Sequence, residues 1–385
     1  MRIAMIYYIY CILGKKLLQY ANIQKNKESY AKKLKIAYIS HKKIKKSSRK
    51  IAEKFLYIYN STVLSYVKYY CIMSVNVCSR EEREMESIKE EIERLKKEKN
   101  AVLLAHYYVP QEVQEAADYV GDSYYLSKMA KQTDADMIVF AGVAFMGESA
   151  KILNPGKRVV LPDGKADCAM AHMASVEKVK QMRKKYEDLA VVCYINSTAE
   201  LKTVSDVCVT SSNAVKIVSA LPNQNIFFIP DGNLAAYVAE QVPEKHIIRN
   251  EGYCPVHDAV TADAVNKAKK EHPKAQLLVH PECTGEVLEL ADFVGSTSEI
   301  ISYAKQAEAR EFLIGTEEGV LYELRKSNPQ KKFYSVMPQC CRDMKLVTLE
   351  KVRDSLKEEK YQVEVDEETR VLAQKALDKM LELAK

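Results

Sequence analysis

The chain has 385 residues, 47% of them apolar, which suffices to bury the cores of two or three domains. Its net charge of +6 is unevenly distributed: residues 1–72 contain 16 Lys and Arg against 2 Asp and Glu, whereas residues 73–385 contain 42 against 50. Because the longer part is acidic, the composition argues against a nucleic-acid-binding protein.

Residues 1–72 are rich in Lys, Ile and Tyr, and no helical or strand period persists through them. Residues 3–13 are apolar; they are too short to span a bilayer but suit the core of a signal peptide. The same composition is what AT-rich DNA encodes in any reading frame. We therefore expect translation to begin at Met73 or Met85, with residues 1–72 outside the fold; a targeting peptide is the alternative.

Residues 73–99 are expected to form an N-terminal helical segment. Its charged helix, residues 87–99, has Ile88, Ile92 and Leu95 on one face and ends at Asn100. The expected i,i+4 ion pairs are Glu90–Arg94 and Glu93–Lys97.

Apolar strands then alternate with amphipathic helices, which predicts parallel sheets covered by helices on both faces. The expected strands are 101–105, 137–141, 158–161, 190–195, 226–229, 246–249, 276–279, 311–314 and 333–336. Asp366 is expected to cap a closing helix. Its expected apolar positions are Val371, Leu372, Leu377, Met380, Leu381 and Leu383.

Three segments of the chain align with one another. Each begins with a strand that ends in a polar anchor, followed by an aspartate 12 residues later and a hydroxyl residue 5 residues after that. The anchors are His106, Tyr194 and His280, the aspartates Asp118, Asp206 and Asp292, and the hydroxyl residues Ser123, Ser211 and Thr297. We expect three similar α/β domains, over residues 100–185, 186–270 and 271–345, and a closing segment 346–385.

Ligands of open parallel sheets bind beyond the carboxyl ends of the strands, where the three anchors lie. Two residues after each anchor, and pointing the same way, come Tyr108, Asn196 and Glu282. The hydroxyl residues are expected to open helices, whose N-termini favour phosphate or carboxylate groups. Ordinary helix caps would explain any one of these positions, but they do not require His or Tyr at the same offset three times.

A cysteine follows each anchor at nearly the same distance, Cys168, Cys254 and Cys341 lying 62, 60 and 61 residues beyond it. Three thiolates around a pseudo-threefold axis suit an iron–sulfur cluster with one open iron. Zinc is the alternative, although structural zinc normally takes four ligands, often from CxxC pairs, which this chain lacks. Spacing alone does not decide between Cys340 and Cys341, although the register favours Cys341.

The other cysteines are interpreted differently, and the absence of a regular disulfide spacing indicates a reducing, cytoplasmic compartment. Cys193 and Cys208 lie within apolar strands and are expected in the core. Cys283 is expected to be structural, and Cys11, Cys71 and Cys78 fall in or next to the N-terminal segment.

The chain resembles the quinolinate synthase family from about residue 86 to its end. The resemblance rests on many motifs in the family's order. They are L-A-His106-Y-Tyr108, Ala117-D-Y-V-G-D-Ser123, Ala141-G-V-x-F-M-G-E, Ala150-K-I-L-N-P, Tyr194-I-N-S-T-A-E-L-K, Val209-T-S-S-N-A, Pro230-D-x-N-L-A, Gly252-Y-C-P-V-H, Val279-H-P-E-C, Val294-G-S-T-S and Cys341-x-x-M-K.

The resemblance implies three pseudo-threefold-related, three-layer αβα domains with short parallel sheets around a central active site. It implies a transferase of de novo NAD biosynthesis that condenses iminoaspartate with dihydroxyacetone phosphate to quinolinate, with loss of phosphate and water. Functional coupling to an aspartate-oxidising enzyme is implied as well, with neither nucleic acid nor membrane as a partner. Cys168, Cys254 and Cys341 would hold one 4Fe–4S cluster with an open, Lewis-acidic iron.

The resemblance also carries over a set of active-site residues. They are His106, Tyr108, Ser123, Tyr194, Asn196, Ser211, His257, His280, Glu282 and Thr297. Glu282 is the expected general base, and His106, Tyr108 and His280 are the other expected catalytic residues. Two rival classes remain: another iron–sulfur hydro-lyase, and a non-enzymatic iron–sulfur sensor or binding protein.

Overall fold

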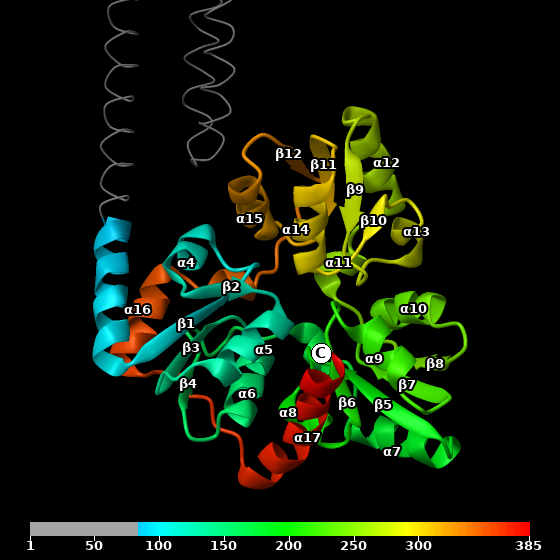
Figure 1. Ribbon diagram of the computed structural model, residues 1–385, viewed down its shortest axis with the longest axis horizontal. Helices are drawn as coiled ribbons and strands as arrows, with labels where there is room; N and C mark the ends of the chain where they lie inside the picture. Colours follow the sequence, from blue (N-terminus) through cyan, green and yellow to red (C-terminus); the bar gives the residue numbers. More distant parts are fainter. Residues whose placement is uncertain (1–83) are drawn as a thin grey trace, which may run out of the picture. The chain divides into compact units, whose positions relative to one another are not determined.

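The computed structural model describes residues 84–385, so the expectations for residues 1–72 lie outside the described part of the chain (Figure 1). Residues 84–99 are helical, and Ile88, Ile92 and Leu95 are buried as expected. Asn100 ends this helix in the left-handed conformation, with φ of 47°.

The ion pairs of this first helix differ from those expected. Arg94 pairs with Glu98 at 2.6 Å, and Lys96 pairs with Glu93 at 2.6 Å and with Asp118 at 2.7 Å. Lys96 reaches Asp118 because it is buried against the first sheet, so its aliphatic stem is covered while its ammonium group meets two carboxylates.

Three four-stranded parallel sheets follow, each flanked by helices (Figure 1). The elements of the first sheet unit are β1 (Ala101–His106), α4 (Gln111–Ala116), β2 (Tyr119–Gly121), α5 (Ser123–Gln132), β3 (Met137–Ala141), α6 (Ala144–Leu153), β4 (Arg158–Val160), η1 (Ala169–His172) and α7 (Val176–Lys185). Those of the second are β5 (Leu189–Tyr194), α8 (Ala199–Thr203), β6 (Val207–Val209), α9 (Ala214–Ala220), β7 (Asn225–Ile229), α10 (Gly232–Gln241), β8 (His246–Arg249), α11 (Pro255–Asp258) and α12 (Ala262–Glu271).

The third unit and the closing segment complete the described chain. Their elements are β9 (Gln276–Val279), α13 (Gly285–Leu288), β10 (Phe293–Val294), α14 (Thr297–Gln306), β11 (Glu311–Gly315), α15 (Val320–Ser327), β12 (Lys332–Ser335), η2 (Met344–Leu346), α16 (Leu349–Glu358) and α17 (Glu367–Leu383). The fold class is therefore α/β with short parallel sheets, as predicted. The boundaries drawn between the three repeats stay a prediction.

The three sheets share one strand order and one register. The orders are β2-β1-β3-β4, β6-β5-β7-β8 and β10-β9-β11-β12. Ala101 pairs with Met137, Leu189 with Asn225 and Gln276 with Phe312, a separation of 36 residues each time. The sequence repeat is thus a repeat of three-dimensional structure. The carboxyl end of the first strand lies in the equivalent place in every sheet.

The repeated aspartate explains part of this register. Asp118, Asp206 and Asp292 each accept a hydrogen bond from the backbone N–H of a residue in the first strand, over 2.8, 2.6 and 2.7 Å. The backbone N–H of each aspartate donates to the carbonyl of the same strand residue. This paired contact fixes where the second strand joins the sheet, so the aspartate has a structural role and not a chemical one.

Hydrophobic cores lie on both faces of the third sheet. Leu277, Val279 and Leu313 pack with α12 and α13, whereas Phe312 and Ile314 face α14 and α15. Because successive strand residues point to opposite faces, the continuous apolar run of each strand serves both layers.

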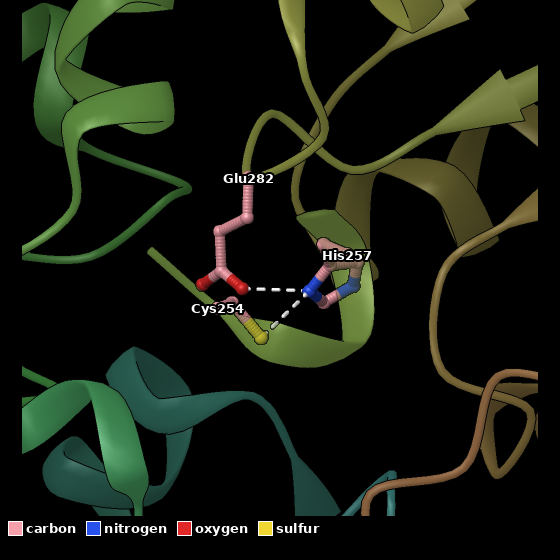
Figure 2. A group of neighbouring side chains, drawn as sticks. All are labelled: Cys254, His257 and Glu282. Carbon is pink, nitrogen blue, oxygen red and sulfur yellow. Dashed lines mark hydrogen bonds and ion pairs between the residues drawn. The ribbon is translucent and has the colours of Figure 1, made fainter. Parts of the chain in front are cut away.

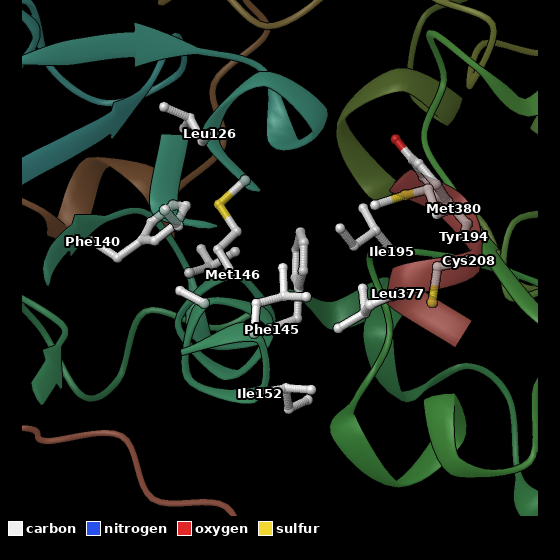
Figure 3. Packing of buried hydrophobic residues seen from close by; sticks show 14 of the residues in the cluster. Leu126, Phe140, Phe145, Met146, Ile152, Tyr194, Ile195, Cys208, Leu377 and Met380 are labelled. Atoms are coloured by element: carbon white, nitrogen blue, oxygen red, sulfur yellow. The ribbon is translucent and has the colours of Figure 1, made fainter. Parts of the chain in front are cut away.

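The closing helices pack on the first two sheet units. α16 contacts β3 and α4, and α17 contacts α6, α8 and β6. Figure 3 shows Phe145 and Ile152 of α6 in one cluster with Leu377 and Met380 of α17. Asp366 caps α17 as predicted, accepting from the Thr369 N–H.

The predicted apolar face of α17 is partly wrong. Val371 and Leu372 are exposed, and the buried positions besides Leu377 and Met380 are Ala373 and Ala376. Small alanines let the helix approach the sheet closely, a preference that hydrophobicity alone does not reveal. None of the helices in the described part of the chain is long and apolar enough to cross a membrane.

Candidate active site and metal centre

Two anchor loops adopt the same local geometry. In the first repeat the Tyr108 N–H donates to His106 Nδ1 at 3.2 Å, and in the third the Glu282 N–H donates to His280 Nδ1 at 3.3 Å. Each histidine is thereby fixed with its Nε2 free to face away from its own loop. The residue two positions on projects beside the histidine, as the sequence predicted for extended strand ends.

Hydroxyl groups join the first and third repeats. The Tyr108 hydroxyl lies 2.7 Å from Thr297 Oγ1 and 2.9 Å from Thr316 Oγ1. Thr316 Oγ1 in turn lies 2.8 Å from His257 Nε2. Predicted site residues from all three repeats thus meet in one hydrogen-bonded network.

Glu282 is the centre of this network. Its carboxylate accepts from the Tyr194 hydroxyl at 2.5 Å and lies 2.7 Å from His257 Nδ1. Figure 2 shows the carboxylate and the Cys254 sulfur on the same side of the His257 ring, with Cys254 Sγ 3.2 Å from Nδ1. Glu282 is only 3% exposed, so it needs these partners to remain charged.

The pKa values of Glu282 and of the two tyrosines in this network are shifted in opposite directions. Burial raises the pKa of Glu282, but the hydrogen bonds that its carboxylate accepts from His257 and Tyr194 outweigh burial and leave the pKa well below the usual range. Burial and the charge of Glu282 hold the pKa of Tyr194 and Tyr108 well above 10. The site therefore holds an ionised carboxylate hydrogen-bonded to the protonated phenol of Tyr194, and the phenol of Tyr108 is protonated as well.

His106 and His280 are neutral at physiological pH. Burial lowers the pKa of each from 6.5 to about 3, with His280 adding to the effect on His106 and Glu282 opposing it. A neutral imidazole can accept or donate one proton, which suits substrate positioning and proton transfer.

These two histidines predict a loss of stability in mild acid. Because their folded-state pKa lies below the unfolded value of 6.5, the unfolded chain binds more protons as the pH falls below 6.5. Each histidine should then cost about 1.4 kcal/mol of unfolding free energy per pH unit. Urea unfolding at pH 7.5 and 5.0 measures this loss.

Single-residue variants assign that pH dependence. His280→Gln should reduce the difference between the two pH values, and His106→Gln should reduce it as well, because each variant removes one buried imidazole. Equal pH dependence in wild type and His280→Gln would contradict the assignment.

The three repeat cysteines occupy equivalent places in the fold. In each repeat, a residue just beyond the third strand donates its N–H to the carbonyl two residues before the cysteine. The bonds run from Ala144 to Ala166 (2.9 Å), from Gly232 to Gly252 (2.7 Å) and from Glu318 to Gln339 (2.8 Å). Gln339 lies two residues before Cys341, which places Cys341, and not the exposed Cys340, in register with Cys168 and Cys254.

The same three sulfurs share a second feature. Backbone N–H groups of the second and third residues after Cys168, Cys254 and Cys341 act to lower the pKa of each thiol and so favour the thiolate. Burial nevertheless raises the pKa of Cys168 to about 12 and of Cys341 to about 11, and that of Cys254 well above 9. Thiols next to backbone N–H groups that favour the thiolate, but too buried to ionise alone, fit a cationic metal centre.

The remaining cysteines of the described chain are accounted for by packing. Cys193 and Cys208 are fully buried neighbours on β5 and β6, as predicted. Cys283 is buried as well, and its thiol points to the Gly315 carbonyl.

A smaller set of potential metal ligands overlaps the cysteine set. Atoms of Cys254, His257 and Glu282 lie within 4.8 Å of one another (Figure 2). Hydrogen bonds already link all three, so the grouping is explained without a metal, but the same atoms are chemically able to bind one.

Three predicted site residues make a long hydrogen bond, or none, to the other predicted site residues. The Ser211 hydroxyl lies 3.3 Å from His280 Nε2, but Ser211 precedes α9 and does not open it, since Asn213 is the cap. Ser123 opens α5 as expected; neither it nor Asn196 hydrogen-bonds to the other predicted site residues in the described chain. Asn196 Oδ1 is buried without a partner there, so it is available to a ligand.

Sequence reasoning missed residues that follow the third strand of each sheet. Thr316 and Glu317 come after β11, and Asp231 comes after β7; all three are fully buried. Burial and the nearby Glu282 raise the pKa of Asp231 well above its usual value. The repeat gave no signal for these positions because the first repeat has Val143 where the others have a carboxylate.

Parallel sheets that bring one cysteine, Cys254, to a buried carboxylate, histidines and tyrosines define an α/β enzyme whose site contains metal-ligating side chains. A family model described as quinolinate synthetase A protein matches residues 90–382. The chain belongs to this quinolinate synthetase A family.

Curated relatives agree with the family match. A quinolinate synthase of Caldicellulosiruptor bescii is 55% identical over 300 residues, which cover 78% of this chain and 99% of the relative. One of Caldicellulosiruptor saccharolyticus is 54% identical over 302 residues, covering 78% and 100%. One of Alkaliphilus metalliredigens is 53% identical over 295 residues, covering 76% and 97%.

Proposed function

We propose that this chain is a transferase of NAD biosynthesis that condenses iminoaspartate with dihydroxyacetone phosphate to form quinolinate, phosphate and water. The observation that carries the proposal is the buried Glu282 carboxylate, held between Tyr194 and His257 beside Cys254. Iminoaspartate would come from an enzyme that oxidises aspartate, since the imine must be made from the amine.

Cys168, Cys254 and Cys341 would hold one 4Fe–4S cluster. Their shared place in the three repeats and the nearby backbone N–H groups that favour each thiolate support this set. When bound, the cluster would supply an open iron as Lewis acid for the loss of water. The fourth coordination position needs no protein ligand, which agrees with three cysteines and not four.

Glu282 would act as general base. Its low pKa keeps it ionised, and its two partners orient it without neutralising it. Tyr194 donates to one carboxylate oxygen and His257 contacts the other, so a proton taken up by Glu282 can be shared with His257. His280, 3.9 Å from the same carboxylate, would assist this transfer.

The remaining residues would bind the substrates. Tyr108 and His106, whose rings contact edge to face, would position the triose and take part in proton transfers. Ser123, Ser211 and Thr297 would bind the phosphate and carboxylate oxygens. Asn196, with its unpartnered oxygen, would hold an amine or imine N–H.

Anaerobic purification of the full chain tests the proposal. We expect about four irons and four sulfides per chain, a visible cluster absorption band, and quinolinate formed from iminoaspartate and dihydroxyacetone phosphate. A full cluster without quinolinate would indicate another hydro-lyase or a sensor. A single metal ion per chain would favour the Cys254, His257 and Glu282 group as the metal site.

A further inference from the structure

A buried carboxylate, that of Glu317, is hydrogen-bonded to the backbone of the third repeat cysteine, Cys341. Glu317 is fully buried, and its Oε1 accepts from the Cys341 backbone N–H at 3.0 Å. Its Oε2 accepts from the Gly319 N–H at 2.6 Å. The carboxylate therefore links the segment just after β11 to the backbone nitrogen of Cys341.

Lys345 completes this arrangement from the other side. Its Nζ lies 3.0 Å from Glu317 Oε1 and donates to the Tyr108 carbonyl at 2.6 Å. The Lys345 N–H donates to the Cys341 carbonyl at 3.2 Å, so the turn after the cysteine carries the lysine back over the carboxylate. One ammonium group thus connects the cysteine loop of the third repeat to the anchor loop of the first.

The two loops also pack directly on each other. A side chain at Gly319 would meet the Tyr107 carbonyl oxygen at 2.6 Å and the Tyr108 Cα at 2.8 Å. Gln114 donates to the carbonyls of Tyr107, Val109 and Gly319. There is no room for the Tyr108 loop to shift alone, so its position follows that of residues 317–319.

The first repeat has an exposed counterpart of this arrangement: Asp167 accepts from the Cys168 N–H at 2.7 Å and lies 2.8 Å from His172 Nε2, four residues after the cysteine. At the position of Glu317 itself the three repeats differ. Val143 occupies the equivalent place in the first repeat, and Asp231 in the second uses its side chain to cap α10. All three repeats keep the backbone bond before the cysteine, but only the third adds a fully buried carboxylate and a lysine that reaches the anchor loop of the first repeat. The repeated fold therefore does not require a buried carboxylate and a lysine at these positions.

We propose that Glu317 and Lys345 are positioning residues that hold Cys341 and Tyr108 in fixed relation to each other. Glu317 fixes the backbone position of Cys341 through the hydrogen bond from its N–H. Lys345 contacts both Glu317 and the Tyr108 carbonyl, so the position of Tyr108 depends on that of Cys341. The inference rests on the proposed function for the role of Cys341 as cluster ligand and of Tyr108 in substrate binding. The mechanical link between the two loops does not depend on it.

Lys345→Met and the double variant Glu317→Met/Lys345→Met test the link. The double variant leaves no unpaired charge in the interior, so it should fold even where a single change destabilises the chain. Lys351→Met is the matched control, because Lys351 also joins a carboxylate, Asp163 at 2.6 Å, to a backbone carbonyl, that of Leu346 at 2.8 Å.

Hydrogen–deuterium exchange gives a readout that needs no cluster. In the double variant, peptides containing Cys341 and peptides covering residues 106–110 should both exchange at least about tenfold faster than in the control. Unchanged exchange in both peptides would overturn the link. Faster exchange at Cys341 alone would overturn the transmission through Lys345.

Two further measurements connect the link to function. Iron loss to a chelator under anaerobic conditions should be about 10- to 100-fold faster in the double variant, as found for groups that orient metal ligands. Lys345→Met should raise KM for dihydroxyacetone phosphate more than it lowers kcat, and Lys345→Arg should restore it. Wild-type protein without iron would count against the proposed function alone, because the exchange result still decides the link.

Discussion

Glu282→Gln is expected to abolish quinolinate formation while leaving the iron and sulfide content unchanged. The carboxylate accepts from the Tyr194 hydroxyl and contacts His257 Nδ1, and the amide keeps the shape but cannot take up a proton at neutral pH. Loss of a general base costs about 10²–10⁴ in rate. Tyr194 also loses one of its acceptor oxygens if the amide nitrogen faces it.

The control for this variant is Glu286→Gln, at an exposed glutamate in the first turn of α13, four residues further along the chain. It removes one negative charge from the same loop and should retain wild-type turnover. The two variants are compared by initial rates of quinolinate formation at equal cluster content. Turnover of Glu282→Gln within a few-fold of wild type would remove Glu282 from the catalytic role.

The strands were predictable because each is a short apolar run with polar residues at its end. The expected strand 101–105 is observed as Ala101–His106, and 226–229 as Asn225–Ile229. The equivalent places of the anchors and cysteines in the fold were predictable because the same spacing occurs three times. Their chemical roles stay a prediction.

The rest of the site escaped because it depends on tertiary contacts. Thr316, Glu317 and Lys345 have no repeated counterpart, and their role appears only when the first and third repeats meet. Val371 and Leu372 were misplaced for the opposite reason: hydrophobicity suggests burial, but α17 packs through its alanines. Sequence patterns thus identify the residues that recur in all three repeats. The residues particular to one repeat are determined by long-range packing.

Cys341→Ser is expected to lose the cluster and with it all quinolinate formation, whereas Cys340→Ser should retain both. The two cysteines are adjacent, but they differ in their surroundings. Cys341 is half-buried, its N–H donates to Glu317, and the backbone N–H groups of Asp343 and Met344 act to lower the pKa of its thiol. Cys340 is exposed and lies outside the register that the three repeats share.

Comparing Cys341→Ser with Cys340→Ser identifies which cysteine is the ligand, because both variants exchange one sulfur for oxygen at neighbouring positions. Iron and sulfide analysis after anaerobic reconstitution is the primary measurement, with the visible absorption spectrum as a second. Serine oxygen is a poor ligand for an iron–sulfur cluster, so even partial assembly in Cys341→Ser should show an altered spectrum. Cluster loss in Cys340→Ser, with a normal cluster in Cys341→Ser, would reverse the assignment and would mean that the chain shifts by one residue when the metal binds.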